Sequence, residues 1–324
     1  MRPEIAVHDS DRMGRNCARV RLLVGCTSRK RAPIPPRLRL GSIPDQDTGA
    51  RAKAWLKRLR TEPVETRPAG QLYAGDHWQV ALSILSSDDP ADLSIVSAGY
   101  GLITLDTEVK PYSATFSAGP DSVASEGIDA GAAGREWWRA LTQAPAVDGS
   151  PRSLADLAAL EPDAVMVVAL SAPYIQALRD DLMAAAARKR LRGRLIIVSA
   201  GTRRIDGMDD ELIPASAELQ GALGGSRNSL NVRIARYIVG ESATHGWDPG
   251  KIAKILRRLG VRAKVADRPE RVRMTDAEVI EFINKAKNDK PHVSKSRLLR
   301  RLRDGGRSCE QGRFGELFVR VARR

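Results

Sequence analysis

The chain has 324 residues, of which 42% are hydrophobic and 28% charged, as is typical of soluble globular proteins with one or two domains. No apolar run approaches the roughly 18 residues of a membrane span, and residues 1–16 lack the apolar core of a secretory signal. Three distant cysteines and four scattered histidines indicate neither a disulfide framework nor a metal site. We therefore expect a cytoplasmic protein that binds no metal and does not associate with membranes.

The net charge of +14 is concentrated towards the C-terminus. Residues 251–324 hold 22 Lys and Arg against 9 Asp and Glu, whereas residues 1–250 hold 31 against 30. Clustered Lys and Arg displace counterions condensed on phosphates, so this asymmetry favours binding of nucleic acid. The alternative is a basic surface that serves only solubility. The sequence thus predicts a body over 1–247 and a basic helical domain over 248–324.

Four apolar runs in the body predict strands, at 19–25, 93–98, 164–170 and 195–201. They are continuous rather than alternating, which is typical of strands covered on both faces. Helical patterns lie between them, at 50–60, 76–87 and 175–191. The alternation predicts an α/β fold with a largely parallel sheet and flanking helices, in which ligands bind outside the carboxyl ends of the strands.

The predicted strands end in small and polar residues, in the sequences GCTSRK, SAGYGL, LSAPY and SAGT. Hydroxyl, thiol and free N–H groups would therefore line one edge of the sheet, which makes candidate ligand-binding residues of Cys26, Ser28, Ser97 and Ser171. The alternative is that small residues only permit tight turns. None of these ends matches a GxGxxG or GxxxxGK[ST] motif, so we expect no dinucleotide, NTP or other cofactor.

The segment 221–239 predicts an anion site, because a helix expected over 229–239 follows a glycine-rich entrance. A helix N-terminus offers free N–H groups and the positive end of the helix dipole. Asn228 and Asn231 lie three positions apart, on neighbouring positions of one helix face, although Asn228 can equally be an N-cap. The glycines and arginines of this candidate site are Gly224, Gly225, Arg227 and Arg233.

Three separated segments carry a resemblance to a known superfamily. Residues 97–112, SAGYGLITLDTEVKPY, resemble the YGL…PY signature of the peroxide-stress YaaA-type proteins. In a related family, found beside 7-deazaguanine tRNA and DNA modification genes, a first strand ends in Cys-x-Ser-x-Lys and a Leu-Tyr pair follows. Residues 26–30 and 72–73 match these motifs. The resemblance covers 19–120 well and 160–240 loosely, and it implies a YaaA-like body, nucleic-acid-directed work and binding roles for Lys30 and Tyr73.

With its basic tail, the chain is also similar to anti-phage DNA glycosylases that remove glucosylated hydroxymethylcytosine from phage genomes. This likeness implies that a monomeric enzyme binds double-stranded phage DNA and extrudes a modified base into a pocket. Two other functions stay open: a non-enzymatic DNA-binding stress protein, and an RNA-directed enzyme of the deazaguanine pathway.

Glycosylase chemistry passes through an oxocarbenium-like state that a carboxylate stabilises, as in glycoside hydrolysis. Asp106, five residues after Gly101, is the candidate carboxylate, and its alternative role is a turn or helix cap. Asn228 and Asn231 are candidates for holding the attacking water or reading the base. Tyr100 and Tyr112 are candidates to stack on or hydrogen-bond the base, with a place in the core as the alternative. Candidates to stack on a sugar attached to the base are Trp78, Trp137 and Trp138, although the pair at 137–138 can also anchor a helix.

The basic domain predicts three helices, which resemble a helix-turn-helix or winged-helix fold. Thr275 and Glu278 form a capping box, and Ser294 begins a second helix that stops at 305–306. Leucines 298, 299 and 302 should face the core, with Phe314, Leu317 and Phe318 packed behind them. The candidate DNA-binding residues are Lys295, Arg297, Arg300, Arg301 and Arg303. Residues 251–265 are expected to form a further helical hairpin that grips phosphates.

Overall fold

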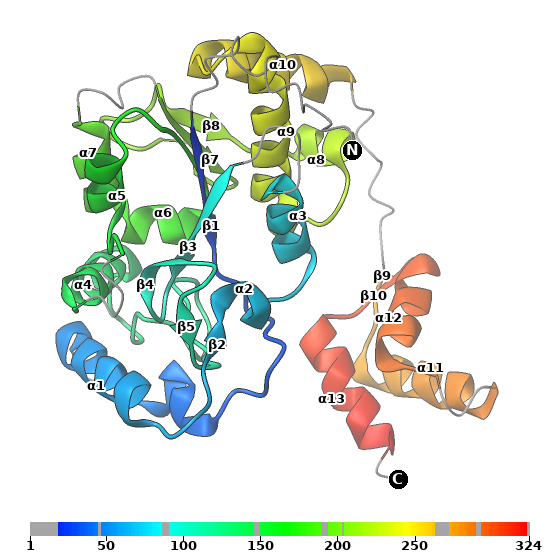
Figure 1. The fold of residues 1–324 in the computed structure, drawn as a ribbon. Coiled ribbons are helices and arrows are strands. Elements are labelled where there is room, and N and C mark those ends of the chain that lie inside the picture. The colour runs from blue at the N-terminus through cyan, green and yellow to red at the C-terminus, as the bar shows by residue number, and fades with distance from the viewer. Residues whose placement is uncertain are drawn as a thin grey trace, which may run out of the picture. The chain divides into compact units, whose positions relative to one another are not determined.

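The fold is taken from a computed structural model, which describes residues 19–44, 47–85, 91–145, 150–188, 194–202, 204–262, 272–289 and 293–322 (Figure 1). These residues form two compact units, Met1–Val265 and Ala266–Arg324. Within the described ranges, no helix combines the length and the apolarity that crossing a bilayer requires.

The first unit is built on a six-stranded sheet with strand order β4-β3-β1-β6-β7-β8. Its centre consists of the four predicted strands, β1 (Val20–Gly25), β3 (Asp92–Ser97), β6 (Val165–Ala169) and β7 (Leu195–Ser199). These pair in parallel, and β8 (Leu212–Pro214) continues the parallel arrangement. The side chains of β6 and β7 are buried throughout because helices cover both faces of the sheet. The prediction of an α/β fold with a largely parallel sheet is confirmed.

The edge strand β4 (Gly101–Thr104) runs antiparallel to β3 and was not predicted. Gly101 pairs with Ser97 and Thr104 pairs with Ser94, so the chain reverses immediately after β3. Gly101 has a φ of +82°, a conformation that glycine adopts without strain. Residues 101–104, which follow β3, therefore form a strand that runs away from the carboxyl edge of the sheet.

Helices cover the sheet in two groups (Figure 1). On one side α4 packs against α1 and α6, and α5 packs against α7; on the other, α9 packs against α3 and α8. The bounds are α1 (Thr48–Thr61), α2 (Ala69–Leu72), α3 (Asp76–Leu85), α4 (Ala130–Gln143), α5 (Leu154–Leu160), α6 (Ala172–Ala177), α7 (Arg179–Ala186), α8 (Ala217–Leu223), α9 (Leu230–His245) and α10 (Pro249–Arg262). Short elements complete the unit: η1 (Pro36–Leu38), η2 (Leu40–Ser42), η4 (Arg227–Ser229), and the pair β2 (Arg67–Pro68) and β5 (Glu108–Val109).

The helix predicted over 175–191 is two helices, because Leu178, with φ −96° and ψ 6°, separates α6 from α7. The ends of this prediction and of the one over 76–87 lie outside the described residues, at 189–191 and 86–87.

The predicted boundary between body and basic domain, at 247/248, is too early. Helix α10 packs against α8 and buries Ile252 and Leu256 in the core of the first unit. Its apolar face therefore makes it part of the body, and the compact units divide after Val265. The expected hairpin over 251–265 is a single helix to Arg262, and residues 263–265 lie outside the described part of the chain.

The second unit contains the three predicted helices, α11 (Asp276–Asp289), α12 (Lys295–Asp304) and α13 (Gln311–Ala322). The capping box is confirmed, since the Thr275 N–H donates to Glu278 Oε2 at 2.7 Å, and Ser294 caps α12 as predicted. The predicted leucines and Phe314 form a separate core together with Val279 and Ile283. A short parallel pair, β9 (Val272–Arg273) and β10 (Arg307–Ser308), was not predicted.

Candidate active site

The loop that follows β1 brings a thiol and an amine above the strand ends. Cys26 continues the sheet by one hydrogen bond, from its N–H to the Val96 carbonyl at 2.9 Å. The chain then curls back, and Lys30 forms a bridge with Tyr73, the residue after α2. The Lys30 ammonium nitrogen Nζ donates to the Thr27 carbonyl at 2.6 Å, which closes the loop on itself. Both Cys26 and Lys30 are half-buried.

A chain of hydroxyl groups begins at the end of β3. Ser97 Oγ accepts from the N–H groups of Gly99 and Tyr100, at 3.1 and 3.0 Å. These bonds occupy both of its lone pairs, so the Ser97 hydroxyl donates its proton to the Tyr112 oxygen, 2.5 Å away. The Tyr112 hydroxyl lies in turn 2.9 Å from that of Tyr73. The serine that ends β3 thus fixes two buried phenols.

The Tyr112 ring packs directly on the backbone of Gly99. A Cβ added at Gly99 would lie 2.4 Å from that ring, a distance that side chains do not tolerate. Two buried tryptophans hold the same loop, because the Trp55 indole N–H donates to the Gly99 carbonyl and that of Trp137 donates to the Ala98 carbonyl, both at 2.8 Å. The small residues of SAGYG therefore let an aromatic ring approach the backbone.

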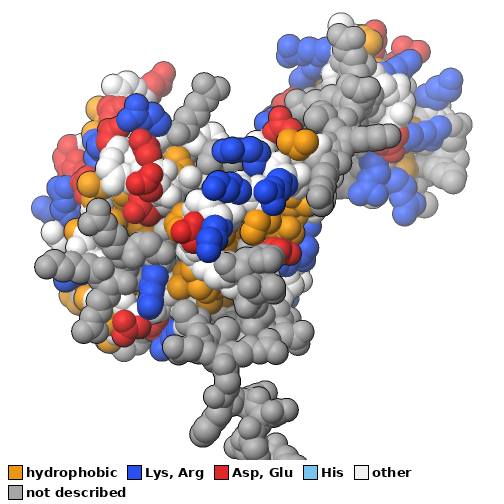
Figure 2. Space-filling view, turned by 90° about the horizontal axis from the view of Figure 1, so that it is seen from above, with side chains coloured by type: hydrophobic (Ala, Val, Ile, Leu, Met, Phe, Trp, Pro, Cys, Tyr) orange, Lys and Arg blue, Asp and Glu red, His pale blue; other side chains and the backbone are white. Residues whose placement is uncertain are grey.

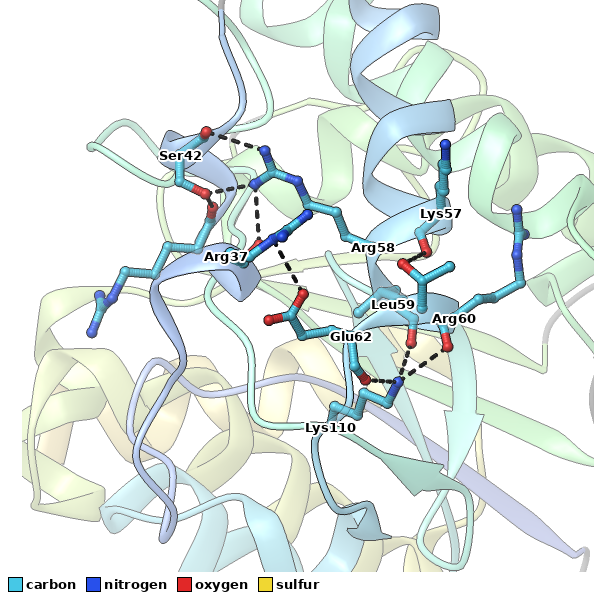
Figure 3. A network of polar contacts seen from close by, with 10 residues as sticks. Arg37, Ser42, Lys57, Arg58, Leu59, Arg60, Glu62 and Lys110 are labelled. Carbon is cyan, nitrogen blue, oxygen red and sulfur yellow. Dashed lines mark hydrogen bonds and ion pairs between the residues drawn. The ribbon is translucent and has the colours of Figure 1, made fainter.

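The segment that delivers Tyr112 is anchored to the end of α1 (Figure 3). Lys110 Nζ donates to the carbonyl groups of Leu59, Arg60 and Glu62, at 2.7, 3.3 and 2.6 Å. A lysine is well suited to this position, because the last carbonyl groups of a helix carry partial negative charge. The Lys110 N–H also donates to the Tyr100 hydroxyl at 2.9 Å, which gives this tyrosine a structural role.

The electrostatics of the cluster favour neutral groups. Lys30 Nζ lies 4.4 Å from the centre of the Tyr112 ring and 5.6 Å from that of Tyr73. Burial lowers the pKa of the Lys30 amine, whereas Cys26 and Asp121 act to raise it and have the smaller effect. Burial raises the pKa of the Tyr73 and Tyr112 phenols, which therefore stay protonated.

The cluster, which we define as Cys26, Lys30, Tyr73, Ser97 and Tyr112, can supply a nucleophile, proton donors and aromatic faces. Tyr73, Ser97 and Tyr112 are completely buried, whereas Cys26 and Lys30 are not. A ligand would therefore meet the thiol and the amine first. Burial among aromatic rings is also the environment that gives lysines nucleophilic character in enzymes.

Asp106 does not join the cluster, so the structure does not bring this predicted catalytic residue together with the others. Because β4 runs antiparallel, Thr104 lies level with Ser94, about 10 Å back along the sheet from Ser97 at the strand rise of roughly 3.3 Å per residue. Asp106 follows Thr104 and is exposed on the turn before β5. The direction of β4 carries it away from the carboxyl edge.

Asn231 lies at the carboxyl edge, where its amide bonds to two backbone groups. Its Nδ2 donates to the Leu170 carbonyl and its Oδ1 accepts from the Ala200 N–H, both at 2.8 Å. The side chain therefore ties α9 to the ends of β6 and β7. Asn228 is exposed in η4 and makes no cap bond for α9.

The predicted anion site at the start of α9 already contains a carboxylate. Asp76, the first residue of α3, accepts from Arg233 Nη2 at 2.8 Å. The Ser229 hydroxyl and the Arg233 guanidinium hold the pKa of this carboxyl below its usual range. Arg233 Nε also donates to Ser229 Oγ, so the guanidinium is committed to the fold. A phosphate would have to displace Asp76, and of the two arginines of the predicted site Arg227 is the exposed one.

The remaining predicted residues occupy separate positions. Ser28 is exposed, and Ser171 is half-buried at the N-cap of α6 without a side-chain cap bond. Gly101 begins β4. The tryptophans proposed for stacking are buried core residues, with 0%, 0% and 3% exposure for Trp78, Trp137 and Trp138.

Two residues adjacent to the cluster were not predicted. The Tyr174 hydroxyl lies 3.4 Å from Cys26 Sγ, and burial raises its pKa. Its position in LSAPY, directly after a predicted strand, was a usable signal. The half-buried Asp121 carboxylate acts on the charge of Lys30 and accepts from the Gly41 N–H at 3.0 Å. Its sequence context, a Gly-Pro-Asp turn, indicated only a loop.

Basic surface lies on both units. In the second, 16 Lys and Arg stand against 9 Asp and Glu, a net charge of +7. Of the predicted DNA-binding residues, Lys295, Arg297, Arg300 and Arg301 are exposed, and Arg303 is half-buried and donates to the Cys309 carbonyl. On the body, α10 exposes Lys251, Lys254, Arg257 and Arg258, and Lys and Arg side chains gather on the face where this helix lies (Figure 2).

No protein-family model matches the chain, and no curated protein shows significant similarity to it.

Proposed function

We propose that the protein is a DNA glycosylase that excises a modified base from phage DNA and leaves an abasic site, as a means of antiviral defence. The candidate base is glucosylated hydroxymethylcytosine. On this proposal the first unit is a YaaA-like catalytic body, and the second is a helix-turn-helix or winged-helix unit that binds duplex DNA.

The observation that carries the proposal is the convergence of three distant segments on one cluster. Residues 26–30, 72–73 and 97–112 carry the resemblance to the YaaA-type and deazaguanine-associated proteins, and each contributes a side chain to the cluster. Residues that shared only structural roles would not need to meet at the carboxyl edge, where α/β proteins bind their ligands. The convergence therefore supports a site for a base or nucleotide.

The basic surfaces support a nucleic-acid substrate. A net charge of +7 on 59 residues, Ala266–Arg324, suits phosphate neutralisation. The three helices, with exposed basic residues on α12, fit a unit that contacts the DNA phosphates and thereby fixes the position of the protein on the duplex. An extruded base would then enter the first unit and reach Cys26 and Lys30 before the buried tyrosines.

The test uses the full-length protein and three duplexes of one sequence that contain cytosine, hydroxymethylcytosine or glucosylated hydroxymethylcytosine. We expect alkali-labile abasic sites and free modified base, detected by mass spectrometry, only with a modified duplex. Tyr112→Phe, which removes the hydroxyl between Ser97 and Tyr73, should slow base release by roughly 10- to 100-fold. Lys57→Met, an exposed change on α1, is the matched control and should act as the unchanged protein does.

Binding of the duplexes without base release would contradict the proposal and favour a non-enzymatic DNA-binding protein. Preferential binding and modification of tRNA would contradict it in favour of an RNA-directed enzyme.

A further inference from the structure

We propose that Lys30 is a covalent nucleophile: its Nζ attacks C1′ of the abasic deoxyribose to form an imine, so that the protein also cleaves the DNA strand as a lyase. This inference rests on the proposed function, because the abasic sugar is the product of base excision. It adds a second activity at the same site and assigns it to one residue.

The hydrogen bonding of Lys30 differs from that of a structural lysine in the same unit. Lys110 donates to three backbone carbonyl groups and is thereby fixed as a helix cap. Lys30 donates to one, the Thr27 carbonyl, and otherwise faces the rings of Tyr112 and Tyr73. Among the described residues, no carboxylate forms an ion pair with it. Its nitrogen is therefore held in place while a lone pair can be presented to a ligand.

Burial supplies the neutral amine that nucleophilic attack needs. The groups that act on Lys30 are Cys26 and Asp121, which favour the charged form, and the neutral phenols of Tyr73 and Tyr112, which do not. Burial outweighs the two opposing charges and lowers the pKa of Lys30. Lys30 is also half-buried, whereas Tyr73 and Tyr112 are completely buried.

The chemistry balances without an oxidant or a cofactor. The abasic sugar opens to an aldehyde, the Nζ lone pair forms a bond to C1′, and the aldehyde oxygen leaves as water with two protons, giving an imine that takes up a proton. Loss of a proton from C2′ to water then breaks the C3′–O bond, and the electron pair leaves on the 3′ phosphate. Hydrolysis of the imine returns the Lys30 amine.

The test separates this step from base excision by supplying a duplex with one pre-formed abasic site. Borohydride, added to the full-length protein and this duplex, reduces the imine to a stable amine and leaves a DNA adduct on a denaturing gel. We expect the adduct, mapped by peptide mass spectrometry, on Lys30, together with strand cleavage in the absence of borohydride. Lys30→Met should lower adduct formation at least about 100-fold, and Lys57→Met, which changes an exposed lysine, should leave it unchanged.

An adduct that maps to another amine would overturn the assignment, and mapping on the unchanged protein makes this outcome independent of how well Lys30→Met folds. Abasic sites that accumulate on a modified duplex without any trapped adduct would also overturn it, while the glycosylase proposal stood. An adduct on Lys30 with no base release from any modified duplex would instead support the lyase step and contradict the glycosylase proposal.

Discussion

Single side chains at the end of β3 determine how the cluster is assembled. Ser97 Oγ accepts hydrogen bonds from two backbone N–H groups, and the Ser97 hydroxyl donates a hydrogen bond to Tyr112. Gly99 leaves room for the ring of that tyrosine. A larger residue at either position would separate the phenol from Tyr73 and from Lys30. The small residues of this turn therefore allow the aromatic ring of Tyr112 to take its position.

Gly99→Ala should displace Tyr112 and reduce activity at the cluster. The added Cβ would lie 2.4 Å from the ring, so the ring or the loop must move. We expect base release to fall by roughly 10-fold or more, because a misplacement of about 1 Å at a reacting group is costly. Initial rates of base release measure this. Gly240→Ala, at an exposed position of α9, is a matched control for the loss of a glycine, since a Cβ at Gly240 has nothing within 4 Å.

The rate of imine formation should rise with pH. Only the deprotonated Lys30 amine carries a lone pair, and its fraction increases as pH passes upward through its pKa. Because burial lowers that pKa, the midpoint should lie below the 10.5 of an ordinary lysine. Borohydride trapping on abasic duplex across a pH series measures the profile. A midpoint at or above 10.5 would contradict the role of burial.

At the scale of elements, α9 is tied to the sheet by one amide. Asn231 joins the first turn of the helix to Leu170 and Ala200, the residues that follow β6 and β7. These two hydrogen bonds fix the start of α9 relative to the carboxyl edge of the sheet. They therefore also help to place Arg233 beside Asp76. The side chain predicted to act in catalysis therefore positions an element.

Asn231→Leu should destabilise the first unit by about 2–4 kcal/mol, because two buried backbone groups lose partners and each such loss costs roughly 1–3 kcal/mol. Denaturant unfolding measures the change. Asn228→Leu, at an exposed position three residues earlier, should change the free energy of unfolding by less than about 0.5 kcal/mol. Equal effects of the two substitutions would contradict the structural role of Asn231.

The sequence was informative wherever local pattern decides the structure. The central strands are continuous apolar runs, and the caps at Thr275 and Ser294 act over three residues, so both were predictable. The residues of the cluster were found because each follows a strand or carries a motif. What could not be predicted depended on distant partners: the reversal of β4 that carries Asp106 away from the cluster, and the backbone groups to which the amide of Asn231 bonds.

At the scale of the whole molecule, the two units have separate hydrophobic cores. The second is formed by side chains of α11, α12 and α13, such as Val279, Leu298 and Phe314, and the described residues of the two cores do not overlap. Each unit therefore has the internal packing that independent folding requires.

Removal of Ala266–Arg324 should leave a folded first unit with weaker DNA binding. The deletion removes a net charge of +7 but keeps the exposed basic residues of α10. We expect a lower affinity and a shallower dependence of log K on log salt concentration, because each phosphate contact contributes about −0.9 to that slope. Fluorescence anisotropy over a salt series, with circular dichroism of the truncated chain, measures both. An unchanged slope would assign DNA binding to the first unit alone.

Separate cores also make the second unit an exchangeable module. A substitution that repacks Leu298 or Phe314 changes no side chain of the core around β1 and β6, so the two units can accumulate changes independently. Replacing Ala266–Arg324 with a binding unit that reads a chosen DNA sequence should then leave the cluster of the first unit intact. On the proposed function, the grafted module would decide at which DNA sequence base excision takes place.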